Sequence, residues 1–481
     1  MRGRAVNRAA EQAFGVVRER GGVELSERLL HLERLRESRL QPPSAAPPPP
    51  RDDDSVDVDV VIAGGGLWSL LAPLLRARGV SVMVADRARA AQSHREWNAS
   101  GAELARLVSL GLMTEAELRE LVVARYDYGT CRFAGGGDYP IRGVLDEAVD
   151  AKGLLEHGRR LGEARAVRYL DGRIVGSHSV GGARVRVRTT SGGVSEDLVA
   201  KVLVDARGAA SPYATADLVC PTVGGVVSGL REGLGPCEMN PRVGDILATI
   251  DGIDEGRQHI WEAFPGRTGE TTVYLFYYAK ASEPLSLLEL YARFFRTLPS
   301  YKRGDAALLR PTFGLIPGWS RLSPAPRPPP GNVVLVGDAA ARHSPLTYCG
   351  FGATLRSLGL ATERIAGMVS GERPSGAAVV DDASVHSLSG ALAHMMASRS
   401  MAGGELNGLL DAAFRTLFEM GEGHYAALLR DEMAPADFIA FLRRTATRHP
   451  AVWRQVIRGL GPVTAGRWGL GAVRAMWTAS A

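Results

Sequence analysis

The sequence predicts a mixed α/β fold with a parallel sheet, an inserted strand-rich region and a helical C-terminus. Three observations support this prediction. Residues 56–86 have the pattern of a strand, a glycine-rich turn, a helix and a second strand, which is the order of a βαβ unit. Two further apolar strands, 200–206 and 333–336, are each associated with a turn that carries an aspartate. From about residue 353 onward the apolar spacing is mostly helical.

The composition is that of a globular protein and excludes several classes. Of 481 residues, 45% are hydrophobic and 23% are charged, which excludes a disordered chain, a collagen and a disulfide scaffold. The four cysteines form no CxxC pair, so we expect no zinc ribbon, no thioredoxin motif and no metal site. The net charge is +5, but basic and aromatic residues do not alternate in any run, so we expect no nucleic-acid partner. We also expect no membrane-spanning helix.

Shifts in composition divide the chain into an N-terminal extension, a linker, a core domain with an insertion, and a C-terminal region. The extension is expected to be helical because its leucines recur at near-helical spacing, and its first arginines resemble the tail of a transit peptide. The linker holds six prolines followed by three aspartates. The ranges are 1–40 for the extension, 41–55 for the linker, 56–370 for the core domain with its insertion at about 90–150 and 215–325, and 371–481 for the helical C-terminal region.

The turn after the first strand is suited to a phosphate group. Gly66 lets a pyrophosphate approach the backbone, and the helix that follows supplies partial positive charge. Asp86 ends the second strand 20 residues later, where a carboxylate accepts hydrogen bonds from ribose hydroxyls. The bulky Trp68 lies inside the turn, so we expect its side chain to point outward or to cover the nucleotide. The turn residues assigned to a cofactor are Gly64, Gly65, Gly66 and Ser69.

Two later motifs predict the rest of a dinucleotide site. Asp338 directly follows Gly337 after a buried strand, where its carboxylate is able to hold the hydroxyls of a ribityl chain. Later glycines let backbone N–H groups approach an isoalloxazine edge. This run resembles the GD…P…G.G motif of flavoproteins with a glutathione-reductase-type FAD-binding fold, and residues 204–211 resemble the middle motif of that group. The residues assigned to FAD from these motifs are Asp205, Gly208, Gly337, Asp338, Pro345, Gly350 and Gly352.

We therefore predict that residues 56–370 form an FAD-binding domain. No second strand–GxGxxG–helix unit occurs, so a dedicated nicotinamide domain is not expected. An external reductant such as NADPH then has to bind transiently, or electrons have to come from a partner.

Four sequence runs resemble the CruA/CruP-type lycopene cyclases and their plastid paralogues. They are Glu-Trp-Asn at 96–98, Trp-Glu-Ala-Phe-Pro at 261–265, Phe-Gly-Leu-Ile-Pro at 313–317, and the glycine-rich run at 337–352. The resemblance covers roughly residues 55–370. It implies a carotenoid substrate and a location in the chloroplast, peripheral to the thylakoid or envelope membrane.

The resemblance also implies FAD in a reaction without net redox change. A terminal double bond of lycopene is protonated, the neighbouring double bond captures the cation, and a proton is lost. Reduced, anionic flavin is thought to stabilise the cation. The acid has to lie in an apolar pocket, where burial raises a carboxyl pKa.

Glu262 is the candidate for that acid, because it lies in an aromatic, strand-like setting. The alternative is a glutamate at a strand edge paired with an arginine. Glu270 is a weaker candidate, and the acidic pair of the plant β-cyclases is not visible in the strand 273–278.

Several neighbouring residues have two interpretations. Glu96 and Asn98 either line the pocket or cap the helix that begins near Ser100. Arg342 either stabilises anionic flavin or faces solvent. Cys349 is expected to be a spectator, because no base is placed near it.

The end of the chain predicts contact with a membrane surface. Residues 438–481 carry seven arginines and no acid, with Trp453, Trp468 and Trp477 interspersed. Such a helix lies at an anionic interface, or it packs its tryptophans on the core.

Two other functions stay open from the sequence. One is an FAD-dependent monooxygenase or other oxidoreductase of apolar substrates. The other is a carotenoid-binding flavoprotein without catalytic activity.

Overall fold

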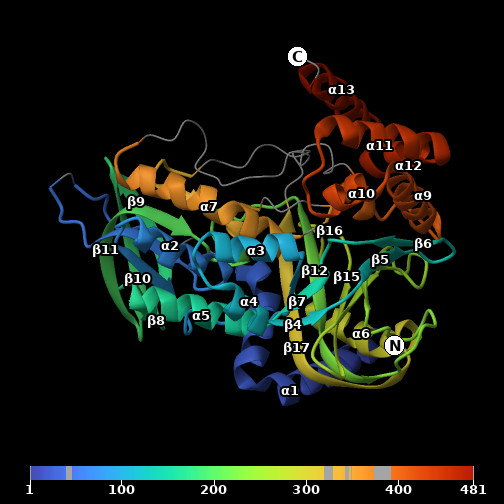
Figure 1. The fold of residues 1–481 in the computed structure, drawn as a ribbon, viewed down its shortest axis with the longest axis horizontal. Helices are drawn as coiled ribbons and strands as arrows, with labels where there is room; N and C mark the ends of the chain where they lie inside the picture. Colours follow the sequence, from blue (N-terminus) through green and yellow to red (C-terminus); the bar gives the residue numbers. More distant parts are fainter. Residues whose placement is uncertain are drawn as a thin grey trace.

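The computed structural model shows two large β-sheets, with helices over the first sheet and a helical group at the C-terminal end of the chain (Figure 1). The structure describes residues 2–38, 46–51, 53–318, 329–341, 346–347, 349–372 and 392–479.

The first sheet has seven strands and contains the predicted parallel unit. Its strands are β1 (Val58–Ala63), β2 (Val82–Asp86), β8 (Arg168–Asp171), β9 (Ile174–Gly181), β10 (Arg184–Ser191), β11 (Val194–Asp205) and β18 (Val333–Leu335). The order is β8-β2-β1-β11-β10-β9, and β18 also pairs with β11. Strands β8, β2, β1, β11 and β18 run parallel, whereas β10 and β9 return antiparallel. The paired segments of β1, β2, β11 and β18 are mostly apolar and buried on both faces, whereas the edge strand β8 is partly exposed.

The second sheet has eight strands and is formed mostly by the predicted insertion. Its strands are β5 (Tyr128–Arg132), β6 (Asp138–Ile141), β12 (Leu218–Leu230), β13 (Val243–Ala248), β14 (Ile260–Pro265), β15 (Glu270–Phe276), β16 (Ala279–Lys280) and β17 (Gly304–Gly318). The order is β16-β12-β15-β14-β13-β5-β6, with β17 also paired to β12. A small third sheet, β3-β7-β4, consists of β3 (Trp97–Ala99), β7 (Glu147–Val149) and β4 (Val122–Arg125).

Most of the remaining helices pack around the first sheet. They are the 3₁₀ turn η1 (Leu67–Leu70), α2 (Leu71–Ala77), α3 (Gly101–Ser109), α4 (Glu115–Leu121), α5 (Ala151–Ala164) and α7 (Gly350–Val369). Two further 3₁₀ turns are η2 (Gly208–Ala210) and η3 (Gly337–Ala340). The helix expected to begin near Ser100 is α3, and Ser100 itself caps it in a capping box with Glu103. Neither Glu96 nor Asn98 caps the helix.

The N-terminal helix packs against the second sheet. Helix α1 (Arg2–Ser38) has a kink at Gly22, where φ is 71°, and buries Val17 and Leu29 in one apolar cluster with α6 (Leu287–Tyr301). The Glu33 carboxylate accepts the backbone N–H groups at the start of α6. The sequence predicted strands and turns throughout 215–325, which is wrong for α6. Its buried residues recur at helical spacing, so the signal was present: Leu287, Leu290, Tyr291, Phe294 and Leu298.

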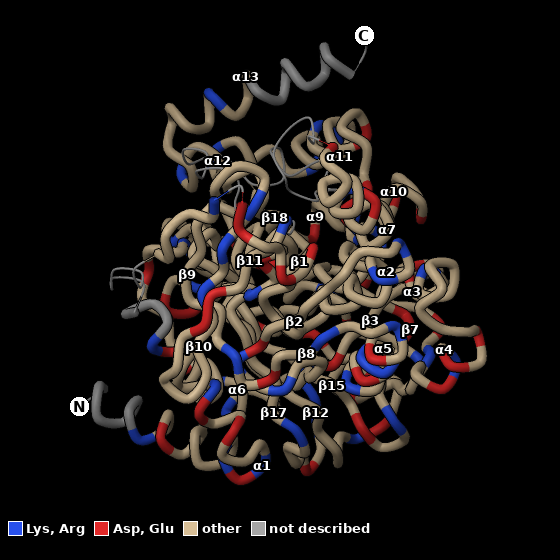
Figure 2. Tube along the Cα trace, turned by 90° about the vertical axis from the view of Figure 1, so that its left-hand side faces the viewer, with Lys and Arg blue, Asp and Glu red and all other residues tan. Residues whose placement is uncertain are grey.

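The C-terminal helices form a group beside β5 and β6 (Figure 1). They are α9 (Glu405–Met420), α10 (Glu422–Leu429), α11 (Pro435–Arg448), α12 (Val452–Leu460) and α13 (Pro462–Ala479). Phe414 packs on Phe133 with ring centroids 4.9 Å apart, and the Tyr425 hydroxyl donates to the Tyr139 carbonyl at 3.0 Å. Figures 1 and 2 both show α13 at the outer end of this group. Within the described residues, no helix combines the length and apolar character needed to cross a bilayer.

Candidate functional site

The predicted cofactor segments meet at one edge of the parallel sheet. The glycine turn follows β1, Asp86 ends β2, Asp205 ends β11 and the Gly-Asp turn follows β18. The Ala206 N–H donates to the Ala63 carbonyl at 2.8 Å, and the Val336 N–H donates to the Asp205 carbonyl at 3.1 Å. In open α/β sheets, ligands bind at the carboxyl ends of such strands.

The glycine turn has the geometry of a phosphate cradle. Gly64 has φ of 113°, and a Cβ atom there would lie 2.4 Å from the Ala206 carbonyl oxygen, so only glycine fits. A Cβ on Gly66 would meet nothing within 4 Å, which leaves space for a ligand. No acceptor for the N–H groups of Gly66 and Leu67 occurs among the described residues. The turn therefore fits a pyrophosphate group.

The Asp86 carboxylate holds the backbone of this turn by two hydrogen bonds. One carboxylate oxygen accepts the Gly65 N–H at 2.7 Å, and the other accepts the Ala88 N–H at 2.8 Å. A Cβ on Gly65 would lie 2.6 Å from the Cα of Ala90, so glycine is required there too. The backbone N–H of the buried Ser69 donates to the Gly66 carbonyl oxygen at 2.9 Å. Each Asp86 oxygen retains a lone pair for a ribose hydroxyl.

Trp68 does not point outward. Its side chain is 8% exposed, and a Cβ on Gly337 would lie 2.6 Å from the indole Nε1. The indole thus packs against Gly337, whose φ of 57° and missing Cβ make room for it. This contact joins the first and last cofactor turns.

Asp205 organises the turn after β11. The carboxylate is fully buried and accepts hydrogen bonds from Arg207 Nη2 at 2.7 Å and Ser211 Oγ at 2.8 Å. Gly208 has φ of 63°, and a Cβ there would lie 3.8 Å from the Cβ of Asp338. The two later motifs are therefore adjacent, as a shared cofactor site requires.

The final glycines lie at the start of α7. Gly350 is the first residue of the helix, and a Cβ on Gly352 would lie 2.2 Å from Glu103 Oε1. Gly352 therefore allows α3 and α7 to approach each other closely. Pro345 and Arg342 lie outside the described residues, so their assignments stay predictions.

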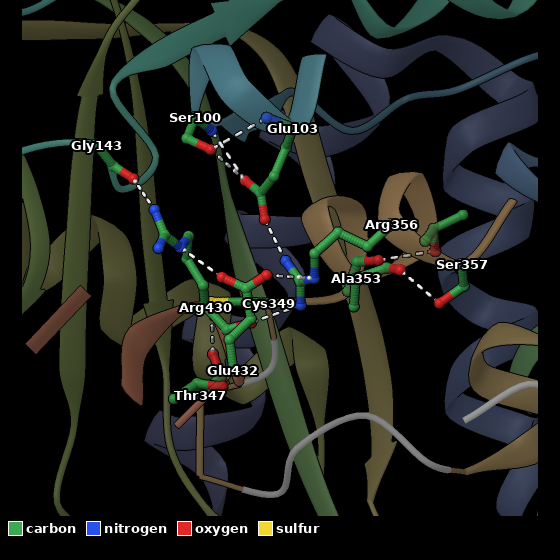
Figure 3. A network of polar contacts seen from close by, with 12 residues as sticks. Ser100, Glu103, Gly143, Thr347, Cys349, Ala353, Arg356, Ser357, Arg430 and Glu432 are labelled. Atoms are coloured by element: carbon green, nitrogen blue, oxygen red, sulfur yellow. Dashed lines mark hydrogen bonds and ion pairs between the residues drawn. The ribbon is translucent and has the colours of Figure 1, made fainter. Parts of the chain in front are cut away.

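An ionic network beside Gly350 and Gly352, buried at Arg356 and Glu103 and partly exposed at Arg430 and Glu432, was not predicted from the sequence. Arg356 on α7 forms ion pairs with Glu103 and with Glu432, the second at 3.3 Å (Figure 3). Arg430 pairs with Glu432 at 2.8 Å and donates to the Gly143 carbonyl at 3.1 Å. The network connects α3, α7 and the segment after α10. Its partners are too far apart in the chain to form a motif.

Glu262 lies in the middle of the second sheet on β14, opposite Tyr274 on β15. Its carboxylate forms no hydrogen bond or ion pair with any described residue, so it is not the arginine-paired glutamate of the alternative interpretation. Burial raises the pKa of Glu262 from 4.5 to about 8. The carboxyl group therefore holds a proton at neutral pH.

The surroundings of Glu262 are apolar and face the start of α7. Glu262 shares a strand face with Ile260 and Phe264, because side chains alternate along β14. Burial above all, and the nearby Glu262 among other charges, raise the pKa of Tyr278 and Cys349. The Tyr278 hydroxyl also donates to the carbonyl of residue 346 at 2.6 Å. Cys349 is a half-buried thiol, and its role as a spectator stays a prediction.

The other candidate carboxylates are engaged. Glu270 accepts a hydrogen bond from Arg310 Nη2 at 2.9 Å, and Glu96 lies 3.5 Å from the same guanidinium. Burial raises the pKa of Glu96, although Arg310 opposes this shift. Asn98 accepts a hydrogen bond from the Tyr126 hydroxyl at 3.0 Å. Glu262 is therefore the unpaired acid of this group within the described structure.

A second ionic centre stabilises the sheet that carries Glu262. Asp245 on β13 accepts hydrogen bonds from the Tyr301 hydroxyl at 2.7 Å and Lys302 Nζ at 2.8 Å, and it also pairs with Arg132. Burial opposes ionisation, but Lys302 and Arg132 outweigh it and hold the pKa of Asp245 below 3.8. Trp261 stacks on Tyr301 with centroids 4.7 Å apart. No local pattern in the sequence indicates this centre.

A small cavity lies on the other face of β14. It is lined by residues that include Gln258, His259, Trp261 and Arg293. Trp261 and Glu262 are adjacent along the strand and point to opposite faces, so this cavity is separate from the candidate acid.

No known family model matches the chain, and no curated protein matches its sequence. Solved structures do match. A flavoprotein/dehydrogenase from Cytophaga hutchinsonii has a TM-score of 0.56 at 12% identity, covering 86% of this chain and 100% of that one. A geranylgeranyl bacteriochlorophyll reductase-like protein from Thermoplasma acidophilum has a TM-score of 0.53 at 13% identity, covering 84% and 98%.

CabE, an aromatic hydroxylase from angucycline biosynthesis, has a TM-score of 0.50 at 18% identity, covering 78% of this chain and 76% of that one. At these identities the likeness establishes the fold and not the reaction. The predicted fold class is confirmed: the chain has the Rossmann-type, FAD-binding α/β fold of flavoproteins, with a helical C-terminus.

Proposed function

We propose that this chain is an FAD-dependent enzyme that acts on an apolar polyene by proton-initiated cyclisation, as the resemblance to lycopene cyclases implies. The observation that carries this proposal is Glu262, a carboxyl without a charged partner among the described residues. Burial raises its pKa to about 8. A protonated acid facing apolar side chains is what protonation of a carbon–carbon double bond requires.

The turn at the sheet edge supports FAD as the cofactor. Space beside Gly66 and the unused N–H groups of Gly66 and Leu67 suit a pyrophosphate, and Asp86 suits a ribose. When bound in its reduced form, FAD supplies negative charge that favours a cation in the substrate.

The proposed step conserves atoms and electrons. Glu262 gives its proton to a terminal double bond, and the neighbouring double bond attacks the resulting cation and closes a ring. A proton then leaves an adjacent carbon, so substrate and product are isomers. Glu262 regains a proton before the next turnover. The apolar neighbours Ile260 and Phe264 exclude water that would otherwise capture the cation.

A second candidate is an FAD-dependent monooxygenase or other oxidoreductase. The fold shared with an aromatic hydroxylase and a flavoprotein/dehydrogenase favours it. Such an enzyme consumes reductant, and a monooxygenase also consumes oxygen and places an oxygen atom in its product. A cyclase consumes neither reductant nor oxygen in stoichiometric amounts, and its product contains no added oxygen atom.

The C-terminal helices supply a candidate membrane surface for a peripheral plastid protein. Trp453 and Ile457 on α12 are 58% and 52% exposed, and Val463 and Leu470 on α13 are also exposed. Trp468 instead packs against the core cluster, so only part of the aromatic set is available to a bilayer. The test is co-sedimentation with vesicles: we expect binding to anionic vesicles that weakens at high salt and in a Trp453→Ser variant.

The function is tested by expressing the chain in a lycopene-accumulating bacterium and analysing the pigments. We expect γ-carotene or β-carotene together with FAD in the purified protein. Unchanged lycopene beside bound FAD would refute the cyclase and leave the oxidoreductase or the non-catalytic carotenoid-binding flavoprotein. Oxygen uptake and NADPH oxidation then separate these two.

A further inference from the structure

The loop 249–259, between β13 and β14, carries buried polar atoms that have no partner. Gln258 is 4% exposed, and its Nε2 donates to the Asp251 carbonyl at 2.9 Å and to the His259 carbonyl at 3.3 Å. These bonds fix the orientation of the amide, so Oε1 is the acceptor that points elsewhere. Within the described structure, neither Gln258 Oε1 nor His259 Nδ1 has a hydrogen-bond partner, although both atoms are buried. Such atoms are costly to bury unless a ligand or a water completes them.

This loop is held firmly by the rest of the fold. Asp254 and Arg257 exchange two backbone hydrogen bonds of 3.0 and 2.9 Å, which close a tight turn. Arg257 is buried and forms an ion pair with Glu283. Asn407 Nδ2 on α9 donates to the Asp251 carbonyl at 2.9 Å. The unpartnered atoms are therefore in fixed positions, as a binding site requires.

Gln258 and His259 line the small cavity that lies on the other face of β14 from Glu262. Trp261 of β14 and Arg293 of α6 also line it. Counted together with the solvent at its mouth, the cavity has a volume of about 250 Å³, less than the ~300–1,000 Å³ of sites for drug-sized ligands. A ligand of only a few atoms fits there.

Arg293 gives this cavity positive charge. Its Nη2 pairs with Asp254 at 2.6 Å, and no other described group accepts a hydrogen bond from this guanidinium. Burial above all, and then the charge of Arg293, lowers the pKa of His259 to about 3, although Asp254 acts in the opposite direction. The imidazole is therefore neutral. Asp251 also lines the cavity, but this residue is exposed to solvent. The positive charge favours an anion over a cation.

The polar atoms around the cavity require an acceptor and a donor from the same ligand. The Arg293 guanidinium donates N–H groups, so it binds a negatively charged oxygen. Gln258 Oε1 is able only to accept, so the ligand has to bring a hydrogen of its own. His259 Nδ1 either donates or accepts, because a neutral imidazole has two tautomers. Nitrate has no O–H group and leaves Gln258 Oε1 unpartnered, and water has no charge for Arg293.

We propose that the cavity between loop 249–259, β14 and α6 binds a small oxyanion that keeps one O–H group. One oxygen of the ion accepts from Arg293, and its O–H donates to Gln258 Oε1. Bicarbonate and hydrogen phosphate share this chemistry. The site lies on the face of β14 opposite to Glu262, so the inference goes beyond the proposed function and does not depend on it.

The test is calorimetric titration of the purified full chain at pH 8 and constant ionic strength. The probes are sodium bicarbonate, sodium phosphate and sodium nitrate. Nitrate matches the charge and planar shape of bicarbonate but has no O–H group. We expect saturable binding of bicarbonate or of hydrogen phosphate, and binding of nitrate that is about fivefold weaker or more. The hydrogen-bearing ion that binds more tightly identifies the ligand.

Three variants test the position of the ion. Arg293→Gln removes the cation and is expected to weaken binding about tenfold or more. Arg296→Gln removes an exposed arginine from the same helix and is the matched control, with little change expected. Asp254→Asn releases Arg293 from its counterion, so we expect binding up to about fivefold tighter. Loss of folding cannot produce such a gain, and thermal unfolding of each variant checks that it is folded.

Three results would overturn the proposal. They are no saturable binding of either hydrogen-bearing ion, equal affinities for nitrate and bicarbonate, or equal affinities in Arg293→Gln and the parent. Absence of binding would leave water as the occupant of the cavity. None of these measurements involves a carotenoid, so failure of the cyclase assay leaves this inference intact, and the reverse also holds.

Discussion

Replacing Glu262 by glutamine removes one ionisable group and preserves the shape of the side chain. Burial raises the pKa of this carboxyl from 4.5 to about 8 in the folded protein. Between these two pH values the unfolded chain has lost the proton and the folded protein keeps it. The folded state therefore binds more protons, and the free energy of unfolding falls as pH rises through this window.

The size of the fall follows from the two pKa values. A change of one in pKa corresponds to about 1.4 kcal/mol, so the full effect of Glu262 is about 5 kcal/mol. About 3 kcal/mol of this is lost by pH 7. Glutamine does not titrate, so we expect Glu262→Gln to gain about 4 kcal/mol relative to the parent between pH 5 and pH 9.

The assay is urea unfolding of both proteins, followed by circular dichroism at pH 5, 7 and 9. Glu270→Gln is the control, because Glu270 is paired with Arg310 at the surface. The same variants are expressed in the lycopene-accumulating bacterium, where Glu262→Gln is expected to form no cyclic product while FAD is retained. Identical pH dependence in the parent and in Glu262→Gln would refute the argument that this carboxyl is held protonated.

Three further variants test the fold and the site. Gly64→Ala forces a Cβ against the Ala206 carbonyl at positive φ, so we expect the free energy of unfolding, measured by thermal unfolding, to fall by about 1–3 kcal/mol or more. We also expect the purified variant to contain little FAD, measured by flavin absorbance. Arg356→Met leaves Glu103 buried without its partner, which is expected to cost about 3–5 kcal/mol in urea unfolding; Glu103→Gln in the same chain should recover part of this loss. Asp245→Asn is expected to cost a similar ~3–5 kcal/mol at pH 7. Because the pKa of Asp245 in the folded protein lies below 3.8, its contribution is fully present above that pH and is lost as the pH falls through the folded-state pKa, so the difference in stability between the two proteins should shrink in acid. A constant difference at all pH values would contradict this assignment.

The cofactor edge was predictable because its signals are local. The run from Gly64 to Gly66 and the acid at Asp86 lie within one βαβ unit, and steric limits on the glycines leave few alternatives. The Gly337-Asp338 turn lies beside this unit because β18 pairs with β11, as expected for a buried parallel strand. Of the two positions expected for Trp68, the outward one is wrong, because the indole packs into space that Gly337 leaves from a distant part of the chain.

The ionic centres were not predictable for a related reason. Glu103 and Arg356 are 253 residues apart, and Asp245 finds Arg132 across 113 residues. Such contacts depend on the tertiary arrangement, and no spacing in the sequence indicates them.

Helix α6 is different, since its apolar spacing was visible but lay inside a region interpreted as strands.

The central claim is that Glu262 transfers a proton to carbon in a reaction without net redox change. Its most direct test is to incubate the purified, flavin-reduced enzyme with lycopene in D₂O under argon and to analyse the product by mass spectrometry. We expect a cyclic isomer that carries one deuterium for each ring formed, with no oxygen incorporated and no stoichiometric NADPH consumed. A product that contains oxygen or added hydride, or a ring without deuterium, would contradict it.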